Sequence, residues 1–173
     1  MIDSYLAWWK GNYHTFGFYK PSELGGWFRE PGILGIDKIG HSYGAYFLYR
    51  TKKNMLLWGG YSAETASWIA LGFTAGVGLM IEIGDGFSNY AFDLRDLLMD
   101  ASGIGYAMLQ DRFPLLQNFN FKFSYYPSEK LSLRFTQHYD ACVFWLTADT
   151  KQDRKSTRLN SSHSDRSRMP SSA

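Results

Sequence analysis

Residues 64–82 read ETASWIALGFTAGVGLMIE, and the 17 positions from Thr65 to Ile81 carry no charge. The run predicts a helix, which we expect to begin at Ser62, a good N-cap residue, and to end at Gly84-Asp85-Gly86, because glycine is unfavourable inside helices. Its small residues allow neighbouring helices to approach closely. Its length suits either the central helix of a compact soluble bundle or a short membrane span, and the sequence leaves both open.

A further helix is expected on each side of this run. The first extends from about Ile36 to about Thr51, with an acidic residue in its first turn, where it suits the helix dipole, and basic residues at its end. The second extends from about Asp93 to about Asp111. Its small and acidic positions are spaced i, i+4, i+7 and i+11 and so share one face; they are Asp96, Asp100, Gly103 and Ala107.

The sequence changes from a helical to an alternating period after the third helix. Aromatic residues at every second position from Phe119 to Tyr125 predict a strand. A turn is expected at 126–130, the alternation continues over 131–135, and residues 141–147 can form a further strand. The expected fold is therefore mainly α, with a three-helix core, an aromatic N-terminal segment before it and a small antiparallel β-hairpin after it.

Three pairs of ionisable residues stand at helical spacing in the three expected helices. Residues three or four apart share a helix face, so each pair projects from one side of its segment. Polar side chains on otherwise small and apolar faces need partners, because burying them unpaired is costly. We therefore expect one polar site shared by three helices, and its candidate members are Asp37 and His41, Glu82 and Asp85, and Asp96 and Asp100.

The role of these six residues stays open at the level of the sequence. Asp37 and His41 suit a metal half-site or a histidine oriented by a carboxylate, and equally a capping aspartate beside a core histidine. Glu82 and Asp85 suit oxygen ligands or a general base, and equally the polar end of an apolar helix. No zinc-protease, nucleotide-binding or nucleophile-elbow motif is present, and the sequence names no cofactor.

The two aspartates of the third helix carry a requirement of their own. Like charges at i and i+4 are unfavourable unless something compensates for them. Lys38, Arg95, His41 or solvent exposure could do so. The six residues together fit either a functional site, with His41 as ligand or base and the carboxylates as ligands, or a structural hydrogen-bond network between helices.

The C-terminal residues 153–173 differ from the rest of the chain. They contain no aromatic residue. Read as codons, residues 153–163 and 167–173 resemble two successive parts of a common sequencing adapter. The gap between them, residues 164–166, has the length of the variable index of that adapter. The alternative is a natural basic, serine-rich disordered tail. We expect an artefactual tail and a single domain at 1–152.

Without that tail, which holds five basic and two acidic residues, the chain has 13 basic and 14 acidic residues in place of 18 and 16. The basic character therefore comes from the tail, and the charge gives no case for nucleic acid as a partner. Cys142 is the single cysteine, so an intrachain disulfide is excluded and the redox compartment is left open. The first residues show no signal segment, so we expect either a cytoplasmic protein or one truncated at its N-terminus.

Four motifs occur in order along the helical part of the chain: Asp37-Lys38-Ile39-Gly40-His41, Glu82-Ile83-Gly84-Asp85-Gly86, Phe92-Asp93-Leu94-Arg95-Asp96 and Asp100-Ala101-Ser102-Gly103. In this order they resemble the YfiM-like family, bacterial envelope proteins of unknown function that are often predicted periplasmic lipoproteins. The likeness covers nearly all of residues 7–148. A remoter similarity is to the VanZ-like membrane family, which has a comparable Asp-Lys-x-x-His start. The chain departs from the YfiM-like pattern at Asp100, where many members have asparagine.

The resemblance implies a location in the cell envelope, in the periplasm or at a membrane, with a membrane or envelope component as partner. It implies no established activity. We therefore expect an uncharacterised envelope protein with a structural or interaction role. The alternative is a metal-dependent hydrolase that uses the histidine and carboxylates.

Overall fold

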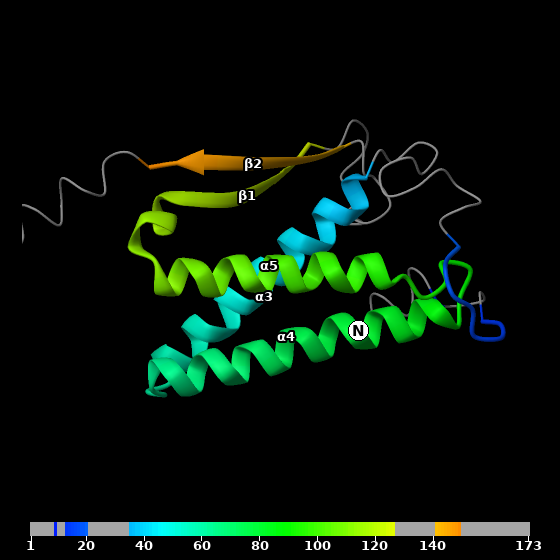
Figure 1. The fold of residues 1–173 in the computed structure, drawn as a ribbon, viewed down its shortest axis with the longest axis horizontal. Helices are drawn as coiled ribbons and strands as arrows, with labels where there is room; N and C mark the ends of the chain where they lie inside the picture. Colours follow the sequence, from blue (N-terminus) through cyan, green and yellow to red (C-terminus); the bar gives the residue numbers. More distant parts are fainter. Residues whose placement is uncertain (1–8, 10–12, 21–34, 127–140, 150–173) are drawn as a thin grey trace, which may run out of the picture.

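A computed structural model of the chain describes residues 9, 13–20, 35–126 and 141–149. The described elements, drawn in Figure 1, are α3 (Ile36–Trp58), α4 (Ala63–Gly86), α5 (Leu94–Arg112), the short 3-10 helix η2 (Pro114–Asn118), β1 (Phe119–Tyr125) and β2 (Cys142–Ala148). The expected mainly α fold with three helices and a small antiparallel sheet is confirmed. The alternation over 131–135 and the expected boundary at residue 152 lie outside the described residues.

α3 is longer than the sequence suggested. It begins after Gly35, whose φ of 74° lies in the left-handed region that favours glycine. The expected end at Thr51 is wrong, because the helix continues to Trp58. It ends in a Schellman motif, in which Tyr61 N donates to Leu56 O and Gly60 N donates to Leu57 O, each with a donor–acceptor distance of 3.1 Å. The adjacent glycines after Trp58, rather than the basic residues before it, mark the end of this helix.

α4 begins where expected and ends later. Ser62 Oγ accepts a hydrogen bond from Thr65 N at 3.2 Å and caps the helix. The expected break at residues 84–86 is wrong, since the helix runs through Gly86. A Cβ atom at Gly84 would collide with the indole of Trp9, and one at Gly86 with the ring of Phe16. These glycines allow the aromatic N-terminal segment to lie directly on the helix.

α5 lies within one residue of its expected bounds. Asp93 caps it, with Oδ1 accepting from Arg95 N at 2.9 Å. The stripe of small residues faces α3, because a Cβ atom at Gly103 would collide with the backbone carbonyl of Ser42. Ala107, further along the same stripe, is fully buried. The stripe therefore sets how closely α3 and α5 pack.

The three helices enclose a small core between them. Figure 1 shows α3 crossing α4 and α5 obliquely, and each of the three helices contacts the other two. The core residues are Ala45, Tyr46, Tyr49, Ala70, Ile104 and Ala107. α3 and α5 contribute five of these six, so α4 is the peripheral member of the bundle.

The sheet covers the side of α5 away from α4 (Figure 1). β1 and β2 are antiparallel, with Phe119 opposite Ala148 and Tyr125 opposite Cys142. The ring centroid of Tyr43 on α3 lies 5.3 Å from that of Phe121. The aromatic side chains of the sheet therefore pack against α3, and the pairing partner of β1 is the stretch expected as a further strand at 141–147.

Residues 13–20, which we call the N-terminal clip, run beside the link between α4 and α5. Gly17 N donates to Gly86 O at 2.8 Å, and Tyr19 N donates to Phe92 O at 2.9 Å. The ring of Phe16 meets that of Phe87 edge-on, with centroids 5.0 Å apart. The expected aromatic N-terminal segment thus packs against the helices in its described part.

The two long faces of α4 differ in a way that bears on function. Its inner face, toward α3 and α5, consists of Ala66, Ala70, Thr74, Gly78, Glu82 and Gly86. Its outer face exposes large apolar side chains, namely Trp68, Ile69, Phe73, Leu79, Met80 and Ile83. Only 22% of its most apolar window is buried, so α4 is not an enclosed central helix. By length and composition alone it could cross a membrane.

Candidate functional site

Lys38 occupies the centre of a charged cluster at the start of α3. Its side chain is almost fully buried, and its Nζ atom pairs with Asp96 Oδ1 at 2.5 Å, Asp93 Oδ2 at 3.0 Å and Asp37 Oδ2 at 3.3 Å. Burial opposes the charge, but the hydrogen bond to Asp96 and the surrounding carboxylates raise the pKa of Lys38 above its ordinary value. Lys38 is therefore the main compensating cation for these carboxylates.

His41 lies one turn further along α3 and faces carboxylates on both ring nitrogens. Nδ1 is 3.2 Å from Asp100 Oδ1, while Nε2 is 3.8 Å from Asp96 Oδ2 and 4.0 Å from Asp37 Oδ1. Burial disfavours the imidazolium, but the hydrogen bond to Asp100 and the charges of Asp96 and Asp37 raise the pKa of His41 to about 9. With this raised pKa, the imidazole ring is protonated at neutral pH.

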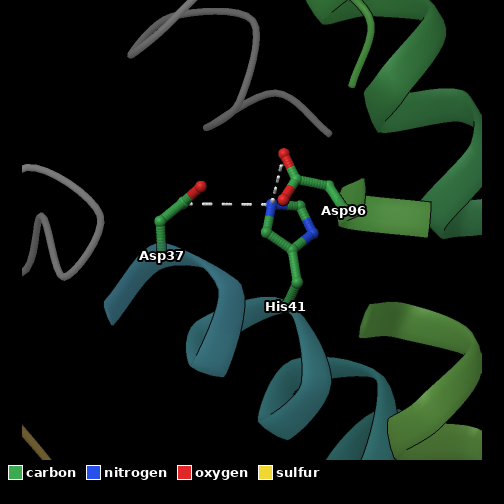
Figure 2. Close-up of side chains that lie close together, drawn as sticks. All are labelled: Asp37, His41 and Asp96. Atoms are coloured by element: carbon green, nitrogen blue, oxygen red, sulfur yellow. Dashed lines mark ion pairs between the residues drawn. The ribbon is translucent and has the colours of Figure 1, made fainter. Parts of the chain in front are cut away.

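Figure 2 shows the side of His41 that Asp37 and Asp96 share. The two carboxyl groups, one from α3 and one from α5, approach the same edge of the imidazole. Asp96 also pairs with Lys38, and its own pKa is raised to about 6, because burial outweighs the lowering effect of His41 and Lys38. Asp96 is therefore a carboxylate that is easily protonated, and it lies beside His41, an imidazole that is readily charged.

Asp100 joins the histidine to α4. Its carboxylate contacts His41 Nδ1, and a Cβ atom at Gly78 of α4 would collide with that same carboxylate. The absence of a side chain at Gly78 therefore gives room for the His41–Asp100 contact. This explains why one face of α4 is built from small residues at the level of the cluster.

Glu82 is the buried acid of α4. Its Oε2 atom accepts from Asp93 N at 3.1 Å, whereas Oε1 is buried with no hydrogen-bond partner among the described residues. Burial raises the pKa of Glu82 to about 8, against the lowering effect of the Asp93 N–H. The side chain is therefore mostly protonated at neutral pH and fastens α4 to the start of α5.

Asp85 lies at the edge of the cluster, where the N-terminal segment meets α4. Trp9 Nε1 donates a hydrogen bond to Asp85 Oδ1 at 2.8 Å. Burial raises the pKa of Asp85, and the positive charge of His41 lowers it, so the two side chains are close enough to interact electrostatically. Asp85 thus connects the aromatic segment with the charged cluster.

Besides Lys38, two more residues outside the expected six belong to the cluster, Asp93 and Arg95. Asp93 accepts hydrogen bonds from the guanidinium of Arg95, with Nη2 at 2.6 Å and Nε at 2.9 Å, and it also pairs with Lys38. Burial is outweighed by these contacts, which lower the pKa of Asp93. The sequence placed Asp93 only at the expected start of the third helix; its capping role is seen in the structure, and its second role as a partner of Lys38 depends on how α3 and α5 pack.

All six expected residues lie where the three helices meet, although with different contacts. Asp37, His41, Asp96 and Asp100 are linked by ion pairs across α3 and α5. Glu82 and Asp85, on α4, interact with His41 through its charge. Their roles as ligands or catalysts remain predictions.

An open groove of about 340 Å³ lies beside the cluster. It is lined by Ser42, Ser102, Gly103, Tyr106, Phe121 and Leu146. None of the six expected residues lines it, although Ser42 follows His41 directly. The groove therefore contacts the α3–α5 seam and the sheet, and not the carboxylates.

Comparisons with other proteins identify a family rather than an activity. Neither the curated proteins nor the solved structures contain a significant match. A family model described as a predicted periplasmic lipoprotein, DUF2279, matches residues 25–112, a range that includes all of α3, α4 and α5 and every residue of the charged cluster. The chain therefore belongs to the DUF2279 family of predicted periplasmic lipoproteins, and its expected location in the cell envelope is confirmed.

Proposed function

We propose that this envelope protein has an interaction role in which the outer face of α4 lies flat against a lipid membrane. The observation that carries the proposal is the exposure of large apolar side chains along one side of a helix whose central 17 positions lack charge. Monomeric soluble proteins rarely expose contiguous apolar patches of this kind. A helix that buries one apolar face in the interface is a known mode of peripheral membrane attachment.

The charged cluster has a structural part in this proposal. Glu82 and Gly78, on the inner face of α4, contact Asp93 and Asp100 of α5. These contacts hold α4 so that its outer face points away from the rest of the bundle.

The closer resemblance of the chain to YfiM-like proteins and its remoter resemblance to VanZ-like proteins remain predictions.

A metal-dependent hydrolase was the alternative function expected from the sequence. Hydrolysis needs a substrate cavity beside the reacting groups. The groove beside the cluster is lined by none of the six candidate residues. This groove gives the candidate residues no such cavity, and the membrane-facing role is the one that we propose.

Flotation with lipid vesicles tests the membrane contact directly. The unacylated full chain is mixed with vesicles of phosphatidylethanolamine and phosphatidylglycerol and centrifuged through a density gradient. We expect it to float, and Leu79→Asn to bind about tenfold more weakly, because burying a leucine stabilises by roughly 1.5–3 kcal/mol. Leu146→Asn, at an exposed leucine of β2, is the matched control and should leave binding unchanged.

Two results would contradict the proposal. The first is failure of the wild-type chain to float, and the second is an equal loss of binding in Leu79→Asn and Leu146→Asn. Extraction at alkaline pH then separates the modes of attachment. Release from vesicles fits a helix lying in the interface, whereas retention would show that α4 spans the bilayer and would overturn the in-plane arrangement.

A further inference from the structure

The edge of His41 that faces Asp37 and Asp96 has the composition of a metal site. One carboxylate oxygen from each aspartate and one nitrogen of His41 all lie within 4.8 Å of one another. Figure 2 shows both carboxyl groups directed to the same ring edge, at 4.0 Å and 3.8 Å from Nε2. Two helices, α3 and α5, hold these donors, so the set depends on the rigid α3–α5 packing and not on a loop.

The other ring nitrogen of His41 is already engaged. Nδ1 lies 3.2 Å from Asp100 Oδ1, which can accept its proton. A neutral imidazole that donates from Nδ1 presents the lone pair of Nε2 to the opposite side, toward Asp37 and Asp96. A histidine oriented by a carboxylate in this way is the usual arrangement for a metal-ligating imidazole.

The surroundings of the three donors carry an excess of acidic groups. Apart from Glu82, which is mostly protonated, the cluster contains five aspartates against the cations Lys38 and Arg95 and the imidazole of His41; the aspartates are Asp37, Asp85, Asp93, Asp96 and Asp100. Glu82, almost fully buried in the same cluster, has an Oε1 atom with no hydrogen-bond partner in the described part of the chain. A divalent cation at Nε2 would reduce this imbalance.

We propose that Asp37, His41 and Asp96 bind one divalent transition-metal ion, with Asp100 as a positioning residue for the imidazole. One nitrogen and two carboxylate donors suit Zn²⁺ or Mn²⁺ better than Mg²⁺ or Ca²⁺, which take oxygen ligands. Donors about 2.1 Å from a tetrahedral ion lie roughly 3.4 Å apart. The distances from Nε2 to the two carboxylates, 4.0 Å and 3.8 Å, would therefore have to shorten by about 0.4–0.6 Å, and no pair of the donors by more than about 1.4 Å.

The metal site is independent of the membrane contact. α4 supplies none of the three donors, and the outer face of α4 has no part in the site. Failure of the flotation experiment therefore leaves this proposal intact, and failure of metal binding leaves the membrane contact intact.

Calorimetric titration of the full chain, purified without a polyhistidine tag and stripped with chelator, tests the site. The probes are Zn²⁺, Mn²⁺ and Mg²⁺ alone, in separate titrations at one fixed pH. We expect one equivalent of Zn²⁺ or Mn²⁺ to bind, at least about tenfold more tightly than Mg²⁺. Co²⁺ in place of Zn²⁺ gives an absorption spectrum that reports its ligand geometry.

Substitutions separate ligands from the positioning residue. Asp37→Asn and His41→Gln should abolish stoichiometric binding, whereas Asp100→Asn should weaken it by about 10–100-fold and change the Co²⁺ spectrum while keeping one ion per chain. Two variants serve as matched controls. His14→Gln changes an exposed histidine, and Asp111→Asn changes an aspartate that pairs with Lys53 at the far end of the same two helices. Both should bind as the wild type does.

The outcomes decide the proposal in either direction. A single ion that is lost in the two ligand variants, weakened in Asp100→Asn and kept in both controls supports it. Failure of the wild type to bind Zn²⁺ or Mn²⁺ more tightly than Mg²⁺ overturns it. Binding that survives in Asp37→Asn and His41→Gln, or that is lost equally in His14→Gln, also overturns it. Circular dichroism of every variant confirms that loss of binding is not loss of fold.

Discussion

The inner and outer faces of α4 reverse the usual distribution of side chains in a protein. Its inner face has only small or polar residues, including Gly78 and a fully buried Glu82, whereas its outer face exposes Trp68 and Phe73. In a soluble helix the large apolar residues normally face the core. The difference teaches that α4 is held by close backbone approach and by polar contacts, which leave its apolar side exposed, as the proposed membrane contact requires.

Replacing Lys38 tests the polar half of this comparison with the largest expected effect. Lys38→Met removes the cation that pairs with three buried or half-buried aspartates, so we expect a loss of roughly 3–5 kcal/mol in the free energy of unfolding. Lys53→Met, which removes the exposed pair with Asp111, should cost about 1 kcal/mol or less. Urea denaturation measures both. Equal losses would show that the buried cluster contributes no more than a surface ion pair.

Glu82 tests whether the inner face contains a neutral acid. Its pKa is raised from 4.5 to about 8 in the folded state, so the folded chain binds the proton more tightly than the unfolded chain. The wild type therefore loses stability as the pH rises from about 4.5 to about 8, and the loss is complete above that range. Glu82→Gln removes this loss, because the amide stays neutral.

We expect Glu82→Gln to be more stable than the wild type by roughly 2–4 kcal/mol at pH 9, and the difference to vanish near pH 4.5, given about 1.4 kcal/mol for each unit of pKa shift. The groups that influence this carboxyl are Asp96, His41 and Asp85. Thermal unfolding across this pH range gives the curve. Glu64→Gln, in the exposed first turn of α4, is the control and should show a small, nearly constant difference. A wild type that is stabilised as the pH rises would refute the neutral form of Glu82.

Replacing glycine by alanine on the two opposite faces of α4 should change the free energy of unfolding in opposite directions. Gly78→Ala places a methyl group against the carboxylate of Asp100, so we expect a loss of about 1–3 kcal/mol. Gly76→Ala meets no atom within 4 Å and should gain about 0.5–1 kcal/mol from helix propensity. Chemical denaturation of the pair gives both values. A gain in both variants would mean that α4 is not closely packed at Gly78.

The smallest effect is expected on the outer face in the absence of lipid. Ile69→Ala removes a side chain that is 40% exposed, and we expect the free energy of unfolding to change by about 0.5 kcal/mol or less. Ile104→Ala, at a buried isoleucine of α5, should cost about 2–5 kcal/mol. A large loss at Ile69 in lipid-free buffer would indicate that another copy of the chain already covers this face.

The elements that the sequence predicted well are those with local signals. The cap at Ser62, the start of the third helix near Asp93 and the alternation from Phe119 to Tyr125 each depend on neighbouring residues, and the structure confirms all three. The end of α3 was wrong even though its signal, Gly59-Gly60, is also local. Basic residues suit the last turn of a helix, but they are equally compatible with further helical turns.

The parts that escaped prediction depend on contacts between distant segments. Gly84 resembles a helix breaker until Trp9 is known to lie against it. The sequence names Lys38 as one possible compensating cation but cannot show that it is buried among three aspartates, because that requires the packing of α3 on α5. The gathering of the six candidate residues was expected from their spacing, whereas their different degrees of burial were not.

The contact between Trp9 and Asp85 has a consequence for how the chain folds. It joins residues 76 positions apart, and the hydrogen bonds of the N-terminal clip to Gly86 and Phe92 join segments almost as distant. Contacts of such long range form slowly, because the entropy of closing the loop is lost before the contact is gained. During synthesis the clip emerges well before its partners. We therefore expect the helices to assemble first and the aromatic segment to dock last, as the closing step of folding.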